Sequence, residues 1–170
     1  MLSLEGRNPP ELVEKTLAQA ESSRVRFVDL QFTDVIGIVK SVTIPIAQFA
    51  AAIEHGKWFD GSSIEGFARI AESDMFLVPD LSTYTIVPTN DAGAGVTARV
   101  ICWVFNPNGE MFPGDPRAVL IRAMKEALDL GFTYKCGPEL EFFLFRRSED
   151  GKILALPRFH RESADAFARL

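Results

Sequence analysis

The sequence has little of what secreted, membrane-spanning or nucleic-acid-binding proteins require. Only two cysteines, Cys102 and Cys136, occur among 170 residues, and no Cys/His spacing suits zinc or a disulfide framework. The N-terminus lacks a signal-peptide pattern, and no segment approaches about 18 consecutive apolar residues. The net charge is -5, from 23 acids against 18 bases, which gives no basic field for nucleic acid or an anionic membrane. We therefore expect a cytoplasmic protein with reduced core thiols that binds small solutes, with no nucleic acid and no membrane partner.

Phosphate-binding loops and repeats are also missing. The turn clusters "NDAGAG" (90–95) and "NPNG" (106–109) match neither a P-loop nor a dinucleotide fingerprint. Hydrophobic residues, by contrast, make up 47% of the chain. That is enough to bury a core, in one domain or in one small domain plus part of another.

The first hundred residues combine strand and helix patterns. Pro9 and Pro10 precede an amphipathic helix, and Pro45 and Gly56 lie at the start and just past the end of a second one. A polar, glycine-bearing stretch follows over 57–71. Segments rich in β-branched and aromatic residues predict strands, of which the first two form a hairpin: 25–34, 35–44, 75–80, 82–88 and 96–105. These patterns predict a mixed sheet with two helices.

A third helix is expected after residue 110. Asp115 and Pro116 are typical of an N-cap and a first helical position, and Gly131 is typical of a C-terminal stop. Between them lies an apolar stripe at helical spacing, made of Leu120, Met124, Ala127 and Leu128. The pattern therefore predicts a helix over about 116–130.

A second unit of the chain begins with this helix. The helix leads directly into a segment, 132–145, whose apolar and aromatic residues predict a strand. We place the boundary between the two units near 105–112. The predicted domains are 1–107 and 112–170.

Two glutamates interrupt this predicted strand. In "GPELEFFLF" (137–145), Glu139 and Glu141 are two residues apart, so on a strand they point to one face, about 6.5 to 7 Å apart. The same face continues as Phe143 and Phe145, which is typical of a pocket wall. Carboxylates beside apolar surface become protonated unless cations hold them ionised. Mg²⁺ or Mn²⁺ fits such oxygen ligands; a solvated edge and an acid pair for glycoside hydrolysis are the alternatives.

A second group of polar residues follows an aromatic pair. In "KWFDGSSIEGF" (57–67), a sheltered Trp58 and Phe59 precede Asp60 and Ser63, which offer a base and a hydroxyl beside a glycine that allows close backbone approach. A plain turn or capping role is the alternative.

Four long blocks of the sequence, in the same order, resemble type I glutamine synthetase. They are "WFDGSSIEGF" (58–67), "ESDMFLVPDLST" (72–83), "ARVICWVFNPNGEMFPGDPR" (98–117) and "CGPELEFFLF" (136–145). The resemblance implies an α+β fold, with a β-grasp-like N-terminal domain over 1–107. The first helix and strand of a catalytic domain would follow within 112–170.

The family makes glutamine from glutamate, ammonia and ATP through γ-glutamyl phosphate, with Mg²⁺ or Mn²⁺. The resemblance implies that Glu139 helps to bind a metal near the nucleotide phosphates and Glu141 a metal near the glutamate. It implies that Asp60 binds ammonium and takes its proton, that Ser63 lies beside it, and that Asp74 has a structural or interface role. No nucleotide-binding residue is assigned. The Asp60 loop would reach into a neighbouring subunit's site, in a homo-oligomeric ring.

Two alternatives accompany this assignment. The first is a ligase that joins glutamate to a polyamine or another amine, although retention of both Asp60 and Ser63 favours ammonia. The second is a non-catalytic interaction module that assembles with full-length synthetase subunits. Because the family's other metal ligands and its glutamate-binding arginines lie beyond residue 170, we expect the isolated chain to be inactive. The last residues, "RESADAFARL" (161–170), depart from the family and read as a short helix.

Overall fold

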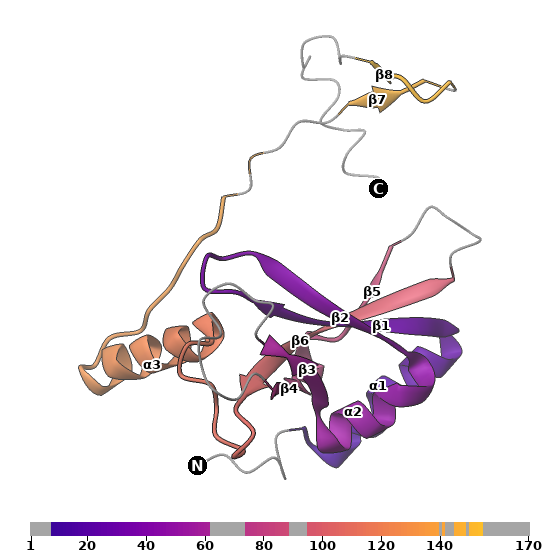
Figure 1. Ribbon diagram of the computed structural model, residues 1–170. Helices are drawn as coiled ribbons and strands as arrows, with labels where there is room; N and C mark the ends of the chain where they lie inside the picture. The colour runs from indigo at the N-terminus through magenta and orange to yellow at the C-terminus, as the bar shows by residue number, and fades with distance from the viewer. Residues whose placement is uncertain are drawn as a thin grey trace. The chain divides into compact units, whose positions relative to one another are not determined.

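The chain forms two compact units, Met1–Tyr134 and Lys135–Leu170 (Figure 1). The computed structural model describes residues 8–61, 74–88, 95–139, 141, 145–148 and 150–154. Within these described ranges, the first unit holds every helix and the larger of two sheets. No helix in the described part of the chain is long and apolar enough to cross a membrane.

A six-stranded sheet is the frame of the first unit. Its strands are β1 (Val25–Thr33), β2 (Val39–Pro45), β3 (Lys57–Asp60), β4 (Asp74–Pro79), β5 (Thr85–Val87) and β6 (Val96–Phe105). The order is β2-β1-β6-β4-β3, and β5 pairs with β6 beside this path. β1 and β6 run parallel, whereas all the other pairs are antiparallel. The prediction of a β-grasp-like domain with a mixed sheet is confirmed.

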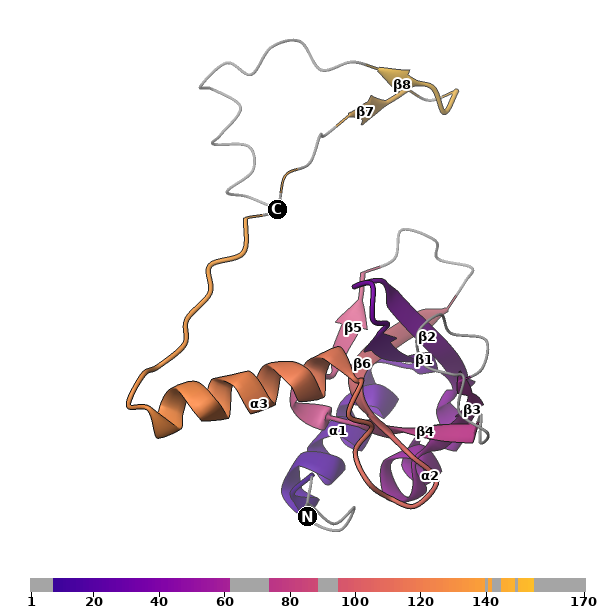
Figure 2. The same ribbon diagram turned by 60° about the vertical axis from the view of Figure 1, so that its left-hand side comes forward.

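Two helices pack against one face of this sheet (Figure 2). They are α1 (Pro10–Ser22) and α2 (Phe49–His55), and a 3-10 turn, η1 (Ile46–Gln48), leads into α2. Side chains alternate along a strand, so every second residue of β6 enters this core: Ala98, Val100, Cys102 and Val104, all buried. A smaller cluster of Phe76, Val78 and Phe105 packs with Trp103 and Met111.

The predicted hairpin is confirmed, and one buried carboxylate organises its turn. Asp34 accepts hydrogen bonds from the backbone N–H groups of Ile36 (3.1 Å) and Ile38 (2.8 Å). Lys40 Nζ lies 3.5 Å from its other oxygen. Asp34 is 1% exposed, so these partners satisfy a carboxylate that water scarcely reaches.

Two expectations about loops and strands were wrong in detail. The first four residues of the stretch expected to be a polar loop, Lys57–Asp60, form β3, because β4 offers a hydrogen-bonding edge and the rings of Trp58 and Phe59 each pack on another ring, Phe76 and Phe32. The strand predicted over 82–88 is shorter in the structure, where it is β5. The residues before β5 form a 3-10 turn instead, η3 (Leu81–Thr83), which Asp80 caps.

The third predicted helix is confirmed as α3 (Pro116–Asp129), with Asp115 accepting a hydrogen bond from the N–H of Arg117 as N-cap. The large residues of its apolar stripe, Leu120, Met124 and Leu128, are exposed, Leu128 by 65%. The helix lies in the first unit. The domain limits given above, 1–107 and 112–170, stay a prediction.

The strand predicted over 132–145 is wrong for the described residues of that segment. Residues 132–139, 141 and 145 are in no strand, because a strand requires a hydrogen-bonded neighbour and no described strand pairs with them. The second unit instead contains a short antiparallel hairpin, β7 (Arg146–Arg147) and β8 (Ile153–Leu154). Leu140, 142–144 and the predicted terminal helix over 161–170 lie outside the described residues.

Candidate active site

Asp60 ends β3 at the edge of the sheet and is exposed to solvent. The strand is held from both sides: the ring of Phe59 lies 5.0 Å from that of Phe32, and the ring of Trp58 lies 5.1 Å from that of Phe76. Trp58 is nevertheless 54% exposed, so the shelter expected for the aromatic pair applies to Phe59 alone. Asp60 therefore stands on a fixed strand end, and the buried Gly61 follows it.

A second carboxylate lies directly across from Asp60. The register of β3 and β4 pairs Asp60 with Asp74, and both residues are exposed. Residues opposite each other on antiparallel strands have Cβ atoms about 5 Å apart, and two like charges in this position repel each other. Two acidic residues therefore lie side by side at this strand end. Ser63 and the rest of 62–73 lie outside the described residues.

Glu139 and Glu141 belong to the second unit, and both are exposed. Their predicted alignment on one face depended on a strand that the described residues do not form. Phe145, expected beside them on a pocket wall, is 58% exposed, and Phe143 lies outside the described residues.

Glu139 and Glu141 offer the type of ligand that a divalent metal prefers, but two carboxylates are too few to form a metal site. Carboxylate oxygens are the ligands that Mg²⁺ and Mn²⁺ prefer. Within the described ranges, however, no three His, Cys, Asp or Glu residues come together as a metal site. If Glu139 and Glu141 bind a metal, they would supply only part of its ligand set.

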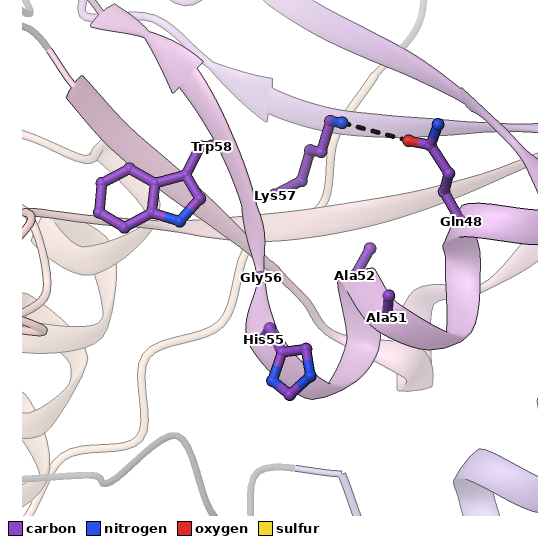
Figure 3. Close-up of a pocket in the computed structure, with 7 residues that line it drawn as sticks. All are labelled: Gln48, Ala51, Ala52, His55, Gly56, Lys57 and Trp58. Carbon is purple, nitrogen blue, oxygen red and sulfur yellow. Dashed lines mark hydrogen bonds between the residues drawn. The ribbon is translucent and has the colours of Figure 1, made fainter.

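A shallow pocket between α2 and β3 has no signal in the sequence (Figure 3). It measures about 370 Å³ and is lined by Gln48, Ala51, Ala52, His55, Gly56, Lys57 and Trp58. Lys57 Nζ donates to Gln48 Oε1 across it at 3.2 Å. Gly56 has a φ of 75°, and a Cβ there would lie 2.8 Å from the ring of Phe76. The lining contains no carboxylate, so the pocket adds no acidic group to Asp60.

A charged cluster where α3 meets the sheet was also missed. Arg117 donates a hydrogen bond to Asp80 Oδ2 and lies over the ring of Trp103, with 3.8 Å from its Cζ to the ring centroid. Burial opposes ionisation of Asp80, but hydrogen bonds from Ser82 and Arg117 outweigh it and hold the pKa of Asp80 below its usual value. Asp80 and Arg117 lie 37 residues apart in the sequence, so no local pattern predicts their ion pair. Only the fold brings the two side chains together.

The two cysteines have different environments. Burial raises the pKa of the Cys102 thiol, which lies in the core and stays protonated. Cys136 is exposed, so the expectation of a core thiol is wrong there, because the apolar neighbours in its segment do not pack around it.

Two stretches of the chain match known families. Residues 24–107 match the family described as "Glutamine synthetase, beta-Grasp domain", and residues 113–166 match "Glutamine synthetase, catalytic domain". The glutamine synthetase of Staphylococcus aureus (strain MW2) is 52% identical over 134 residues, and that of Staphylococcus epidermidis is 51% identical over the same length. Each match covers 78% of this chain and 30% of the relative, so the chain spans under a third of their length.

Solved structures share the fold. The cryoEM structure of Plasmodium falciparum glutamine synthetase matches with a TM-score of 0.61 and 21% identity, over 76% of this chain and 24% of that chain. An ADP complex of GmaS matches with a TM-score of 0.59 and 21% identity, over 68% of this chain and 26% of that chain.

Proposed function

The chain belongs to the glutamine synthetase family, and from this premise we propose that it contributes to a glutamate–ammonia ligase that forms glutamine with ATP through γ-glutamyl phosphate. The observation that carries the proposal is the 52% identity over 134 residues to a synthetase. The two family regions also follow each other in the chain without overlap, at 24–107 and 113–166.

We propose that Glu139 and Glu141 each contribute to binding a Mg²⁺ or Mn²⁺ ion. Glu139 would help to hold the ion beside the nucleotide phosphates, and Glu141 the ion beside glutamate. Divalent ions at such a site neutralise charge on the transferring phosphoryl group. Because both side chains are exposed and no described third ligand joins them, the remaining ligands come from elsewhere in the complete enzyme.

Asp60 is proposed to bind ammonium and accept its proton, with Ser63 beside it. A carboxylate suits both steps, since it attracts the cation and then serves as the base that yields ammonia. The position of Asp74 opposite Asp60 supports this role, because a second negative charge deepens the attraction for a small cation. In this proposal the loop after Asp60 serves a neighbouring subunit of a homo-oligomeric ring.

The test uses a chimera: the Staphylococcus aureus synthetase with residues 24–145 of this chain in place of its own segment. Glutamine formation is expected to require glutamate, ammonium, ATP and Mg²⁺ or Mn²⁺. Glu139→Ala is expected to lower kcat by about 100-fold or more, because a metal ligand is lost. Glu126→Ala, which removes an exposed acid of α3, is the matched control and keeps full activity.

Two results would overturn the assignment. Full activity of the Glu139→Ala chimera would remove the metal role. ADP release with a polyamine but not with ammonium would replace the ammonia ligase by an amine ligase.

A further inference from the structure

Arg117 joins the two family regions of the chain through one side chain. It lies on the first turn of α3, inside the region that matches the catalytic domain. Its guanidinium contacts Asp80, just after β4, and Trp103 on β6, both in the region that matches the β-grasp domain. A planar cation between a carboxylate and an indole ring gains an ion pair and a cation–π contact together.

The carboxylate that receives Arg117 is itself held in place. Asp80 Oδ1 accepts hydrogen bonds from the backbone N–H and the hydroxyl of Ser82. The N–H of Asp80 donates to the carbonyl of Ile101 on β6 at 2.9 Å. Asp80 thus presents its Oδ2 from a turn bound to the central strand.

A second connection lies beside the first. Asp115 is buried, and its Oδ1 accepts from the N–H of Arg117 at 3.0 Å while Oδ2 accepts from the N–H of Val104 at 3.2 Å. Both connections hold only the first turn of α3. Farther along the helix the apolar side chains are exposed, Leu120 by 48% and Leu128 by 65%. The direction of α3 therefore depends on the contacts at its start.

The guanidinium of Arg117 has few other groups that could replace Asp80 and Trp103 as its partners. Its Nη1 is buried and has no hydrogen-bond partner among the described residues. Loss of Asp80 would leave a largely desolvated charge uncompensated. Lysine cannot reproduce the contact, because an ammonium has no planar face to stack on Trp103 while it binds Asp80.

We propose that Arg117 is a positioning residue that fixes the direction of α3 relative to the β-grasp sheet, and thereby the presentation of Asp60 to ammonium in the assembled enzyme. The second half of this statement rests on the proposed function. Arg117 does not touch substrate; it acts through the orientation of α3 relative to the sheet that carries Asp60.

The first test measures α3 in the 170-residue chain and needs no activity. Amide hydrogen exchange over 120–129 is expected to become about tenfold faster in Arg117→Lys and in Asp80→Asn, because the helix loses its attachment. Exchange in β1 and β6 is expected to stay unchanged, which verifies that the variants fold. Equal exchange of α3 in all three proteins would overturn the proposal.

The second test uses the chimera. Arg117→Lys is expected to raise the KM for ammonium about five- to tenfold, with the KM for ATP and kcat little changed, because the carboxylate that binds ammonium is misplaced. Asp80→Asn should give the same shift, and the double variant should add nothing further. Lys125→Gln, on the exposed part of α3, is the control.

The outcomes separate the two proposals. A lowered kcat with an unchanged KM for ammonium, or additive effects of the two substitutions, would overturn the positioning role. An unsubstituted chimera that forms no glutamine would count against the proposed function instead, and the exchange measurement would then decide whether Arg117 holds α3.

Discussion

The two acid-bearing regions of this protein differ in what holds them. Asp60 ends a strand that pairs with β4, and aromatic rings pack that strand onto the sheet. Glu139 and Glu141 lie on a segment with no described strand partner, and both are exposed. The first unit thus holds its own carboxylate in place, whereas no described strand does the same for the acid pair of the second unit. Acidic residues of a motif become a site only where surrounding contacts fix them.

The largest effect on stability is expected from Phe49→Ala, which removes an aromatic ring from the core of the first unit. Phe49 is fully buried, and its ring stacks on Tyr84 with 5.9 Å between centroids. Loss of the ring leaves a cavity and lowers the free energy of unfolding by about 3 to 5 kcal/mol. Urea unfolding followed by the fluorescence of Trp58 and Trp103 measures the change.

Phe145→Ala in the second unit is the matched control. This ring is 58% exposed, so its removal is expected to change the free energy of unfolding by less than about 0.5 kcal/mol. Similar losses in the free energy of unfolding for both substitutions would mean that the two units are equally well packed, which would contradict the difference between them.

A smaller effect is expected at the turns of the two hairpins. Asp34→Ala removes a buried carboxylate that accepts two backbone N–H groups, and we expect a loss of about 1 to 3 kcal/mol. In the second unit, Asp150 contacts Lys152 and Ser148 in the turn between β7 and β8 but is exposed. Asp150→Ala should leave the urea midpoint unchanged. A lower midpoint for Asp150→Ala alone would reverse the ranking of the two turns.

The pH dependence of stability is expected to carry two opposite contributions from the base of α3. The pKa of Asp80 lies below 3.8 in the folded state, so its stabilisation is present above about pH 3.8 and is lost as the pH falls through the folded value. Burial raises the pKa of Asp115 above 3.8, despite hydrogen bonds from Val104 and Arg117. Its stabilisation is full below about pH 3.8 and is lost as the pH rises through the folded value.

Substitutions separate these contributions. Asp80→Asn is expected to flatten the acid-side decline in the free energy of unfolding, and Asp115→Asn to flatten the decline above about pH 4. Urea unfolding at a series of pH values from about 2.5 to 6 measures both slopes. If both substitutions changed the slope on the same side, one of the two pKa directions would be wrong.

The smallest effect is expected from the acid pair in the isolated chain. Because no described third ligand joins Glu139 and Glu141, calorimetric titration of the 170-residue chain should detect only weak Mn²⁺ uptake. Replacing both by glutamine should leave that uptake unchanged, whereas in the chimera it should abolish tight binding. The opposite result would be tight Mn²⁺ binding by the isolated chain that the double substitution abolishes. It would show that the second unit by itself holds Glu139 and Glu141 in a metal-binding arrangement.

Much of the fold could be predicted because its signals are local. Pro10 and Pro116 begin α1 and α3 as expected, Asp115 caps α3, and Gly56 ends α2 with a positive φ. Alternating burial along β6 follows from the geometry of a strand, in which successive side chains point to opposite faces. The motif suggests Asp60 as a candidate site residue, but it does not predict the position of Asp60 opposite Asp74, since that pairing joins residues of different strands.

The sequence by itself determined the helix caps, the hairpin, the order of the strands along the chain and the family. These follow from backbone preferences and side-chain periodicities that act over a few residues. Only the tertiary structure decided that Lys57–Asp60 pairs with β4, that Arg117 lies between Asp80 and Trp103, and that the segment carrying Glu139 has no strand partner among the described residues. Each of these depends on which distant residue supplies the other half of a contact, and a local pattern does not contain that information.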